Sequence, residues 1–202
     1  MSITKKSVLL ISLILIADQV LKIWVKTHMV MGEEIHLFGN WGMLHFIENN
    51  GMAFGMEMGG KTGKFLLSIF RIIAVAGIGW VLVSLIRKKA NAGLILSVSA
   101  IMAGAVGNII DSAFYGMIFS ESYSQPAIMF PPGGGYASFL QGRVVDMFYF
   151  PVINTHWPMW SPINPGQSFV FFSPVFNISD SAITCGVIAI ILFQKKMFKD
   201  LK

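Results

Sequence analysis

Residues 90–110 of this chain read ANAGLILSVSAIMAGAVGNII and contain no charged side chain. An α-helix rises about 1.5 Å per residue, so about 20 apolar residues cross the hydrocarbon core of a bilayer. A run of this length and composition is typical of a transmembrane helix. The residue that follows the run is an acid, Asp111. The sequence therefore predicts a membrane span over 90–111 that ends on a carboxylate.

Three further runs, residues 7–24, 65–86 and 176–194, are also long and apolar, and each contains at most two charged residues. The whole chain is 54% hydrophobic and 12% charged, whereas a soluble domain carries about 25% charged residues. This composition excludes a disordered chain, a coiled coil and an ordinary cytosolic enzyme. We expect a mainly α membrane protein, in which residues 1–202 form a single integral membrane domain with four transmembrane helices.

The basic residues gather at the ends of these runs. Nine of the fifteen Lys and Arg residues lie before the first run, between the second and third, and after the fourth. Because Lys and Arg flanking a span stay on the cytoplasmic side, both termini are predicted to be cytoplasmic, with the outer segments being 25–64 and 113–175. The net charge of +5 is thus a signal of topology, and no basic patch with interleaved aromatic residues indicates a nucleic acid partner.

A cleaved signal peptide is the alternative interpretation of residues 1–24, which combine a basic start with an apolar stretch. The segment lacks a small-x-small cleavage site, and Asp18 and Lys22 are unusual in a signal peptide. We therefore favour a retained first span.

The outer segments have the composition of ordered structure. Residues 35–38 and 43–47 alternate apolar and polar side chains around Gly39-Asn40, a pattern typical of short strands joined by a turn. We expect a small extracytoplasmic β-sheet, with extended outer loops over 113–143 and 151–174. The aromatic residues of the second loop are predicted to be anchors at the headgroup level, with a lipid-binding groove as the alternative.

Four acids are predicted near the outer leaflet boundary: Asp18, Asp111, Asp146 and Asp180. An acid at the bilayer centre costs about 2.5–3.5 kcal/mol, so each is a functional candidate. Two carboxylates in contact cannot both ionise, and a pair that shares one proton can activate water and protonate a carbonyl oxygen or a leaving amine. The His and Cys residues show no metal-ligand spacing and no G-x-S-x-G is present, so we expect neither a metal site nor a serine nucleophile.

Five short blocks carry a resemblance to a known family. They read ADQVLK at 17–22, NNGMAFG at 49–55, GAVGNIID at 104–111, RVVDMF at 143–148 and FNISDS at 176–181. In this order they resemble the motif blocks of the bacterial lipoprotein signal peptidases, or signal peptidase II. The resemblance implies an aspartic endopeptidase of the bacterial cytoplasmic (inner) membrane that works without a cofactor. It would cleave diacylglyceryl-modified prolipoproteins immediately before the lipidated Cys.

The resemblance assigns the catalytic pair to Asp146 and Asp180. We hypothesise that Asp180 ionises more readily, because a helix N-terminus favours negative charge, and that Asp146 holds the proton. The resemblance also implies prolipoprotein substrates and membrane lipid as partners, and a monomer. The remaining matched positions are expected to support the site or to bind substrate: Asp18, Lys22, Asn49, Gly51, Gly107, Asn108, Asp111, Arg143 and Asn177.

Several of these positions could instead have a purely structural role. Asp18 and Lys22 lie four residues apart, so they share a helix face and can form an ion pair that anchors the first span. Asp111 is favoured as an ion-pair partner, and since Ser112 stands where the family usually has Arg, Arg143 is a candidate for the lost cation. The sequence also allows a tight turn at Asn49–Gly51, a helix bridge at Asn108, a helix cap at Asn177 and close helix approach at Gly104 and Gly107.

Two further classes of protein remain open. A transporter or proton relay uses buried acids as an ion pathway, but it would spread them across the membrane depth. The two outer segments differ in length and content, which argues against an inverted-repeat transporter. A scaffold without catalytic activity would tolerate Asp→Asn changes at both Asp146 and Asp180.

Overall fold

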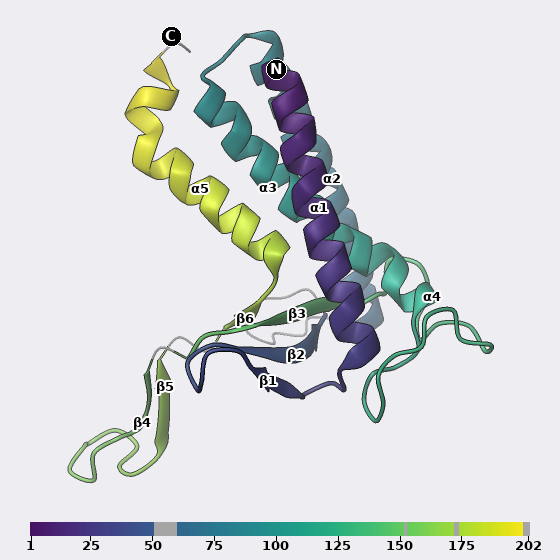
Figure 1. Ribbon diagram of the computed structural model, residues 1–202, viewed down its shortest axis with the longest axis vertical. Coiled ribbons are helices and arrows are strands. Elements are labelled where there is room, and N and C mark those ends of the chain that lie inside the picture. Colours follow the sequence, from purple (N-terminus) through teal and green to yellow (C-terminus); the bar gives the residue numbers. More distant parts are fainter. Residues whose placement is uncertain (51–59, 152, 172–173, 200–202) are drawn as a thin grey trace.

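The computed structural model, described for residues 1–50, 60–151, 153–171 and 174–199, has four long helices standing on a small β-sheet (Figure 1). The helices are α1 (Ile3–His28), α2 (Gly60–Arg87), α3 (Ala92–Ile110) and α5 (Ile178–Met197), and each is long and apolar enough to cross a membrane. The start of α1 and the end of α5 lie at the end of the bundle remote from the sheet (Figure 1). The predicted fold class, a mainly helical membrane protein with a small antiparallel sheet, is confirmed.

The third span does not end at Asp111. The chain continues through a π-helical turn, η2 (Asp111–Tyr115), into the short helix α4 (Gly116–Ile118), so the apolar helical stretch covers residues 92–118. The Ser112 hydroxyl donates to the Asn108 carbonyl at 3.0 Å, and no proline interrupts residues 111–118. Single π-helical turns inside helices occur frequently at functional sites. This one holds the buried side chain of Asp111.

Helix α3 is the central helix and packs against α1, α2 and α5. Two glycines allow the contact with α5. A Cβ atom on Gly104 would lie 2.2 Å from the carbonyl oxygen of Ser179, and one on Gly107 would lie 2.0 Å from the Ser179 hydroxyl. Real Cβ atoms do not approach that closely, so the prediction that these glycines permit close helix approach is confirmed.

The main sheet is antiparallel, with strand order β1-β2-β3-β6. The predicted hairpin is present as β1 (Glu34–His36) and β2 (Met43–Asn49). Strand β3 (Val144–Tyr149) was not predicted, although it carries Asp146, which lies opposite Ile47 of β2. The two-residue strand β6 (Val175–Phe176) leads directly into α5, so the predicted fourth run begins slightly before its helix.

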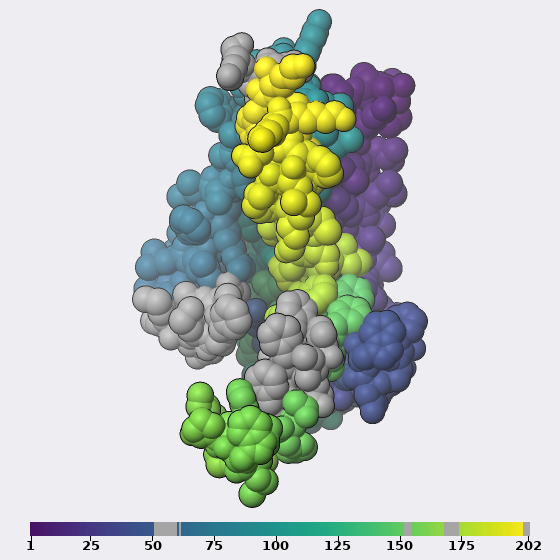
Figure 2. Space-filling view, turned by 90° about the vertical axis from the view of Figure 1, so that its left-hand side faces the viewer, coloured from purple at the N-terminus to yellow at the C-terminus, as the bar shows by residue number. Residues whose placement is uncertain are grey.

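A second, two-stranded sheet is formed by β4 (Ile153–His156) and β5 (Ser168–Phe171). It projects beyond the main sheet, away from the helices (Figures 1 and 2). The connection between its strands exposes Met159 and Trp160 almost fully. The proposed anchoring of these aromatic residues at the headgroup level stays a prediction.

An apolar core fixes the sheet against the bundle. It lies where the end of α1, the η2 turn and the strands β2 and β3 meet, and it is fully closed to solvent at Val145 and Met147 of β3. Because neighbouring residues of a strand point to opposite faces, Asp146 points away from this core, where it is also buried. The residues of the core are Val25, Met29, Leu44, Phe46, Tyr115, Phe119, Ala127, Val145 and Met147.

Candidate active site

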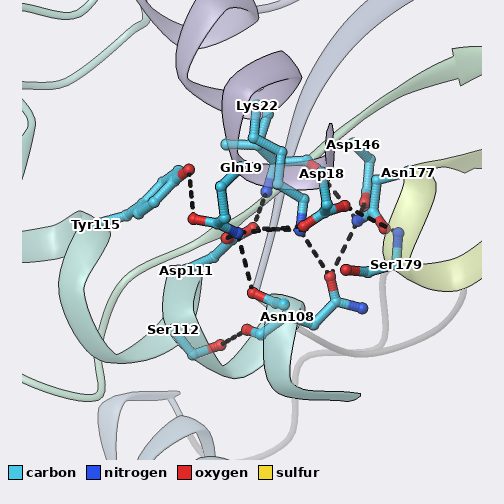
Figure 3. A network of polar contacts seen from close by, with 12 residues as sticks. Asp18, Gln19, Lys22, Asn108, Asp111, Ser112, Tyr115, Asp146, Asn177 and Ser179 are labelled. Atoms are coloured by element: carbon cyan, nitrogen blue, oxygen red, sulfur yellow. Dashed lines mark hydrogen bonds and ion pairs between the residues drawn. The ribbon is translucent and has the colours of Figure 1, made fainter. Parts of the chain in front are cut away.

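The four predicted acids come together where the helix bundle meets the sheet. Asp18 comes from α1, Asp111 from the end of α3, Asp146 from β3 and Asp180 from the first turn of α5. The first three are buried, and Asp180 is half-buried. Figure 3 shows the polar contacts that join Asp18, Asp111 and Asp146 with their neighbours. The network joins segments that are far apart in the sequence. For example, the Ser179 N–H donates to Asp18, 161 residues away in the chain.

Lys22 is the cation of this network. Its ammonium lies 2.9 Å from a carboxylate oxygen of Asp18 and 2.9 Å from one of Asp111, and it donates to the side-chain oxygen of Asn108 at 2.9 Å. All three donors of the ammonium are therefore used. The expected ion pair between Asp18 and Lys22 is present and extends to Asp111. Arg143, the candidate for the cation that is missing at Ser112, forms its ion pairs elsewhere, with Glu48 and Glu121.

Gln19 was not selected from the sequence, although it lies inside the first motif block. Its amide nitrogen donates to Asp18 at 3.1 Å and to Asp111 at 3.0 Å, and its oxygen accepts from the Tyr115 hydroxyl at 3.2 Å (Figure 3). A polar side chain next to an acid within an apolar span was the signal that could have identified it. Gln19 holds the two carboxylates of the Lys22 cluster in place.

Asp146 and Asp180 are held by amide groups. Asp146 accepts a hydrogen bond from the Asn177 side chain at 2.7 Å and one from the Asn49 side chain at 3.2 Å. Asp180 accepts one from the Asn108 side chain at 2.8 Å. Burial, and then the negative charge of Asp180, raise the pKa of Asp146 to about 7. Asp146 can therefore exchange a proton near neutral pH.

Asn177 connects the two acids. It is the N-cap of α5 and forms a capping box, in which its side chain accepts from the Asp180 N–H at 2.9 Å and the Asp180 carboxylate accepts from the Asn177 N–H at 3.3 Å. The predicted cap is thus confirmed. The amide nitrogen of the same side chain reaches Asp146, so the start of α5 is tied to the middle of β3.

Asn108 joins this pair to the Lys22 cluster. Its oxygen accepts from Lys22 at 2.9 Å and from Asn177 at 3.1 Å, while its nitrogen donates to Asp180. One turn of α3 therefore contacts both halves of the network. Gly107, beside it, has no room for a side chain, since an added Cβ would also lie 2.8 Å from Asp18. Gly51 lies outside the described residues.

Arg143 belongs to a second charge cluster, which is only partly buried. Its guanidinium lies 2.7 Å from Glu121 and 3.0 Å from Glu48, and Glu48 also pairs with Lys26 of α1. Burial opposes the ionisation of Glu48, but Lys26 and Arg143 outweigh it and lower its pKa. Lys26 follows Lys22 by four residues on the same face of α1, a spacing that could have predicted it. This cluster fixes the start of β3 rather than contacting the four acids.

Comparison with known proteins gives one family. The sequence model of the family described as "Signal peptidase (SPase) II" matches residues 10–195. The lipoprotein signal peptidase of Porphyromonas gingivalis is 52% identical over 184 residues, which cover 91% of this chain and 80% of that protein. The lipoprotein signal peptidase of Amoebophilus asiaticus is 39% identical over 186 residues, which cover 91% of this chain and 75% of that protein.

Solved structures agree with this result. One described as "Bacterial membrane enzyme structure by the in meso method at 2.3 A resolution" aligns with a TM-score of 0.61 at 26% identity, covering 95% of this chain and 88% of the other. A second, described in the same words at 1.9 Å resolution, gives a TM-score of 0.57 at 27% identity and covers 93% and 91% of the two chains. The fold of this chain is thus similar to that of solved bacterial membrane enzymes.

Proposed function

Since this chain belongs to the signal peptidase II family, and is thus a membrane aspartic protease that removes signal peptides from prolipoproteins, we propose that Asp146 and Asp180 are its catalytic pair. The observation that carries the proposal is the shared contact of Asn177, whose side chain donates to Asp146 and caps the helix turn that presents Asp180. We further propose that the cut falls immediately before the lipidated Cys of a diacylglyceryl-modified prolipoprotein.

The reaction begins with the pair sharing one proton. Two carboxylates this close to a common neighbour repel one another when both are ionised, and the pKa of Asp146, raised to about 7, favours Asp146 as the protonated member. Asp180 lies at the N-terminus of α5, where the helix dipole stabilises a negative charge. Asp180 is therefore the base and Asp146 the acid at the start of the cycle.

In the first step, Asp180 takes a proton from water while the water oxygen bonds to the carbonyl carbon before the Cys. Asp146 gives its proton to the carbonyl oxygen, which produces a tetrahedral intermediate without a net charge on it. In the second step, the carbon–nitrogen bond breaks, the proton on Asp180 passes to the leaving amine, and a hydroxyl proton of the intermediate returns to Asp146. The pair is then restored to its starting state.

The surrounding groups keep the pair in place. The amides of Asn49 and Asn108 each donate to one catalytic carboxylate, at 3.2 Å and 2.8 Å. Lys22 pairs with both Asp18 and Asp111 and neutralises much of their charge beside the catalytic pair. In this proposal these residues support the site, as does Asn177, and none of them exchanges a proton with the substrate.

We propose the following location for this chemistry. The nine basic residues at the ends of the spans favour cytoplasmic termini in the bacterial inner membrane, so the sheet and the four acids lie at the outer leaflet boundary. A diacylglyceryl-Cys keeps its acyl chains in that leaflet, so its peptide bond reaches the acids without the lipid entering water. The partners are then a prolipoprotein and membrane lipid, with the enzyme acting as a monomer.

The deciding experiment is a cleavage assay in detergent with a diacylglyceryl-modified prolipoprotein. Asp146→Asn and Asp180→Asn are each expected to lower the rate by about 10²–10⁴-fold, the usual contribution of an acid–base group. Glu34→Gln, a matched carboxylate-to-amide change on β1 of the same sheet, should cleave normally. Mass spectrometry of the product should give a lipidated Cys as its first residue. Cleavage that survives either Asp change would contradict the assignment of the catalytic pair. A product that begins with a residue other than the lipidated Cys would contradict the proposed cleavage site.

A further inference from the structure

Helix α2 carries one charge within its apolar run, Arg71. The side chain is half-buried, and its charge interacts with three of the four acids, most strongly with Asp180, then with Asp146 and Asp111. A charge inside a membrane span is costly unless it meets opposite charges, so its place near the acids is informative. Neither the motif blocks nor the mechanism above uses this residue.

The same face of α2 makes polar contacts beside the site. Lys64, Ser68 and Arg71 follow one another at the i, i+4, i+7 spacing that places residues on one helix face. The Lys64 ammonium donates to the Asn50 side chain at 3.0 Å, and the Ser68 hydroxyl donates to the Leu140 carbonyl at 3.0 Å. This face of α2 therefore lies against the chain next to Asn49 and against the segment that leads into β3.

The direction of α2 also favours an approach of the Arg71 side chain to the acids. Side chains of an α-helix lean toward its N-terminus, and the N-terminus of α2 is the end that carries Lys64. The guanidinium of Arg71 is thus directed toward the sheet end of the bundle, where Asp146 and Asp180 lie. Its electrostatic interaction with them follows from this placement.

The positive charge of Lys22 lies on Asp18 and Asp111 rather than on the catalytic pair. Lys22 uses its three donors on Asp18, Asp111 and Asn108, and the described hydrogen bonds to the catalytic carboxylates come from amide groups. Lys22 acts on Asp146 only at longer range. Among the described residues, the charged groups on the elements around the pair are Asp18 and Lys22 of α1, Lys64 and Arg71 of α2, and Asp111 at the end of α3, beside Asp146 of β3 and Asp180 of α5.

We propose that Arg71 is a positioning residue of the catalytic pair, whose positive charge stabilises the state in which one of Asp146 and Asp180 is ionised. It thereby sets the lowest pH at which the pair can activate water. This inference rests on the proposed function, because it assumes that these two acids perform the cleavage. Arg71 acts through the pair, by the effect of its charge on the two carboxylates.

The test is the pH dependence of kcat and KM from pH 5 to 9 for the full-length protein in detergent. Arg71→Met keeps most of the apolar stem and removes the charge. The acid limb of its pH–rate profile should move up by about one pH unit, which on that limb is a tenfold loss of rate. The alkaline limb, set by loss of the proton from Asp146, should move up with it, so the rate at high pH should not fall. Arg71→Lys should return the acid limb toward its original position. Arg87→Met, at the opposite end of α2, is the matched control and should match the unaltered protein.

Several results would overturn the inference. An unshifted acid limb in Arg71→Met would do so, as would an equal loss of rate at every pH, since the latter indicates a structural role alone. Arg71→Gln provides a second neutral variant, and failure of both neutral variants to fold would also assign the residue a structural role. If the unaltered protein does not cleave the substrate, the proposed function is wrong. If it cleaves the substrate but the acid limb of the pH–rate profile does not shift in Arg71→Met, only the proposed role of Arg71 is wrong.

Discussion

The side chain of Asn177, at the start of α5, donates a hydrogen bond of 2.7 Å to Asp146 in the middle of β3. The same side chain caps α5 at the Asp180 N–H. Helix capping and the placement of two acids therefore depend on one amide. This contact ties the first turn of α5 to the middle of β3, in addition to the direct connection through β6. The contact with Asp146 and the capping of α5 can therefore be tested separately.

Asn177→Ala should lower both stability and activity. Loss of an N-cap costs about 1 kcal/mol, and loss of the contact with Asp146 should reduce the cleavage rate by at least tenfold. Asn91→Ala is the matched control, because Asn91 caps α3 through the Gly93 N–H at 2.9 Å, far from the acids. The unfolding temperature should fall in both variants, and further in Asn177→Ala, which also loses hydrogen bonds to Asp146 and Asn108. Cleavage should fall only in Asn177→Ala. Equal cleavage by the two variants would show that Asn177 is only a cap.

Asp146→Asn should change how stability depends on pH. The pKa of Asp146 is raised to about 7 in the folded protein, above its ordinary value of 3.8, so the folded state binds more protons than the unfolded state between these values. The contribution of Asp146 to stability therefore falls as pH rises through this window, by about 1.4 kcal/mol per pH unit at most. The unfolding free energy of the variant relative to the unaltered protein should increase from pH 5 to pH 7, as measured by thermal or denaturant unfolding. A difference that is flat with pH would contradict the shifted pKa.

Lys22→Met should destabilise the protein strongly. The substitution leaves Asp18 and Asp111 buried without their cation, and breaking a buried ion pair typically costs about 3–5 kcal/mol. Adding Asp111→Asn removes one of the two uncompensated charges and should recover part of the loss. Unfolding of the two single variants and the double variant gives the coupling between them. Strictly additive effects would mean that Lys22 and Asp111 do not interact as the 2.9 Å separation indicates.

The four long helices and the four acids that come together could be predicted from the sequence. Both predictions depend on composition, which a bilayer restricts severely. A charge such as Asp18 stands out because its neighbours are apolar. Strand β3 was missed because Val144–Tyr149 is buried on both faces, so the polar and apolar alternation that identifies a half-exposed strand is absent. Its partner β2 lies nearly 100 residues away, as the 97-residue separation of Asn49 and Asp146 shows.

The contacts of the long cations could not be predicted in the same way. Arg143 was expected as a candidate for the cation missing at Ser112, but its partners, Glu48 and Glu121, were not identified from the sequence. The ion pairs of these cations depend on how the sheet packs against α1. A local sequence pattern contains no information on that packing. By contrast, the cap at Asn177 was predictable, because capping acts over three residues of the same chain segment.

Gly107→Ala tests the closest approach of α3 and α5. The added Cβ would meet the Ser179 hydroxyl at 2.0 Å and Asp18 at 2.8 Å, so α5 has to move and with it Asp180. Unfolding temperature and cleavage should both fall. Gly77→Ala in α2 is the matched control, since its Cβ meets nothing within 4 Å and the change should gain about 0.5–1 kcal/mol of helix stability.

The cause of the Gly107→Ala defect can be separated from a general loss of packing by changing its partner. The Ser179 hydroxyl is buried and has no hydrogen-bond partner among the described residues, so Ser179→Ala alone should leave stability unchanged or raise it. In Gly107→Ala with Ser179→Ala, the closest Ser179 atom becomes its Cβ at 3.3 Å, which a small shift can accommodate. The double variant should therefore be more stable and more active than Gly107→Ala. If Ser179→Ala brings no recovery, the contact with Asp18 limits the approach instead, and the helix separation at Gly107 is set by α1 rather than by α5.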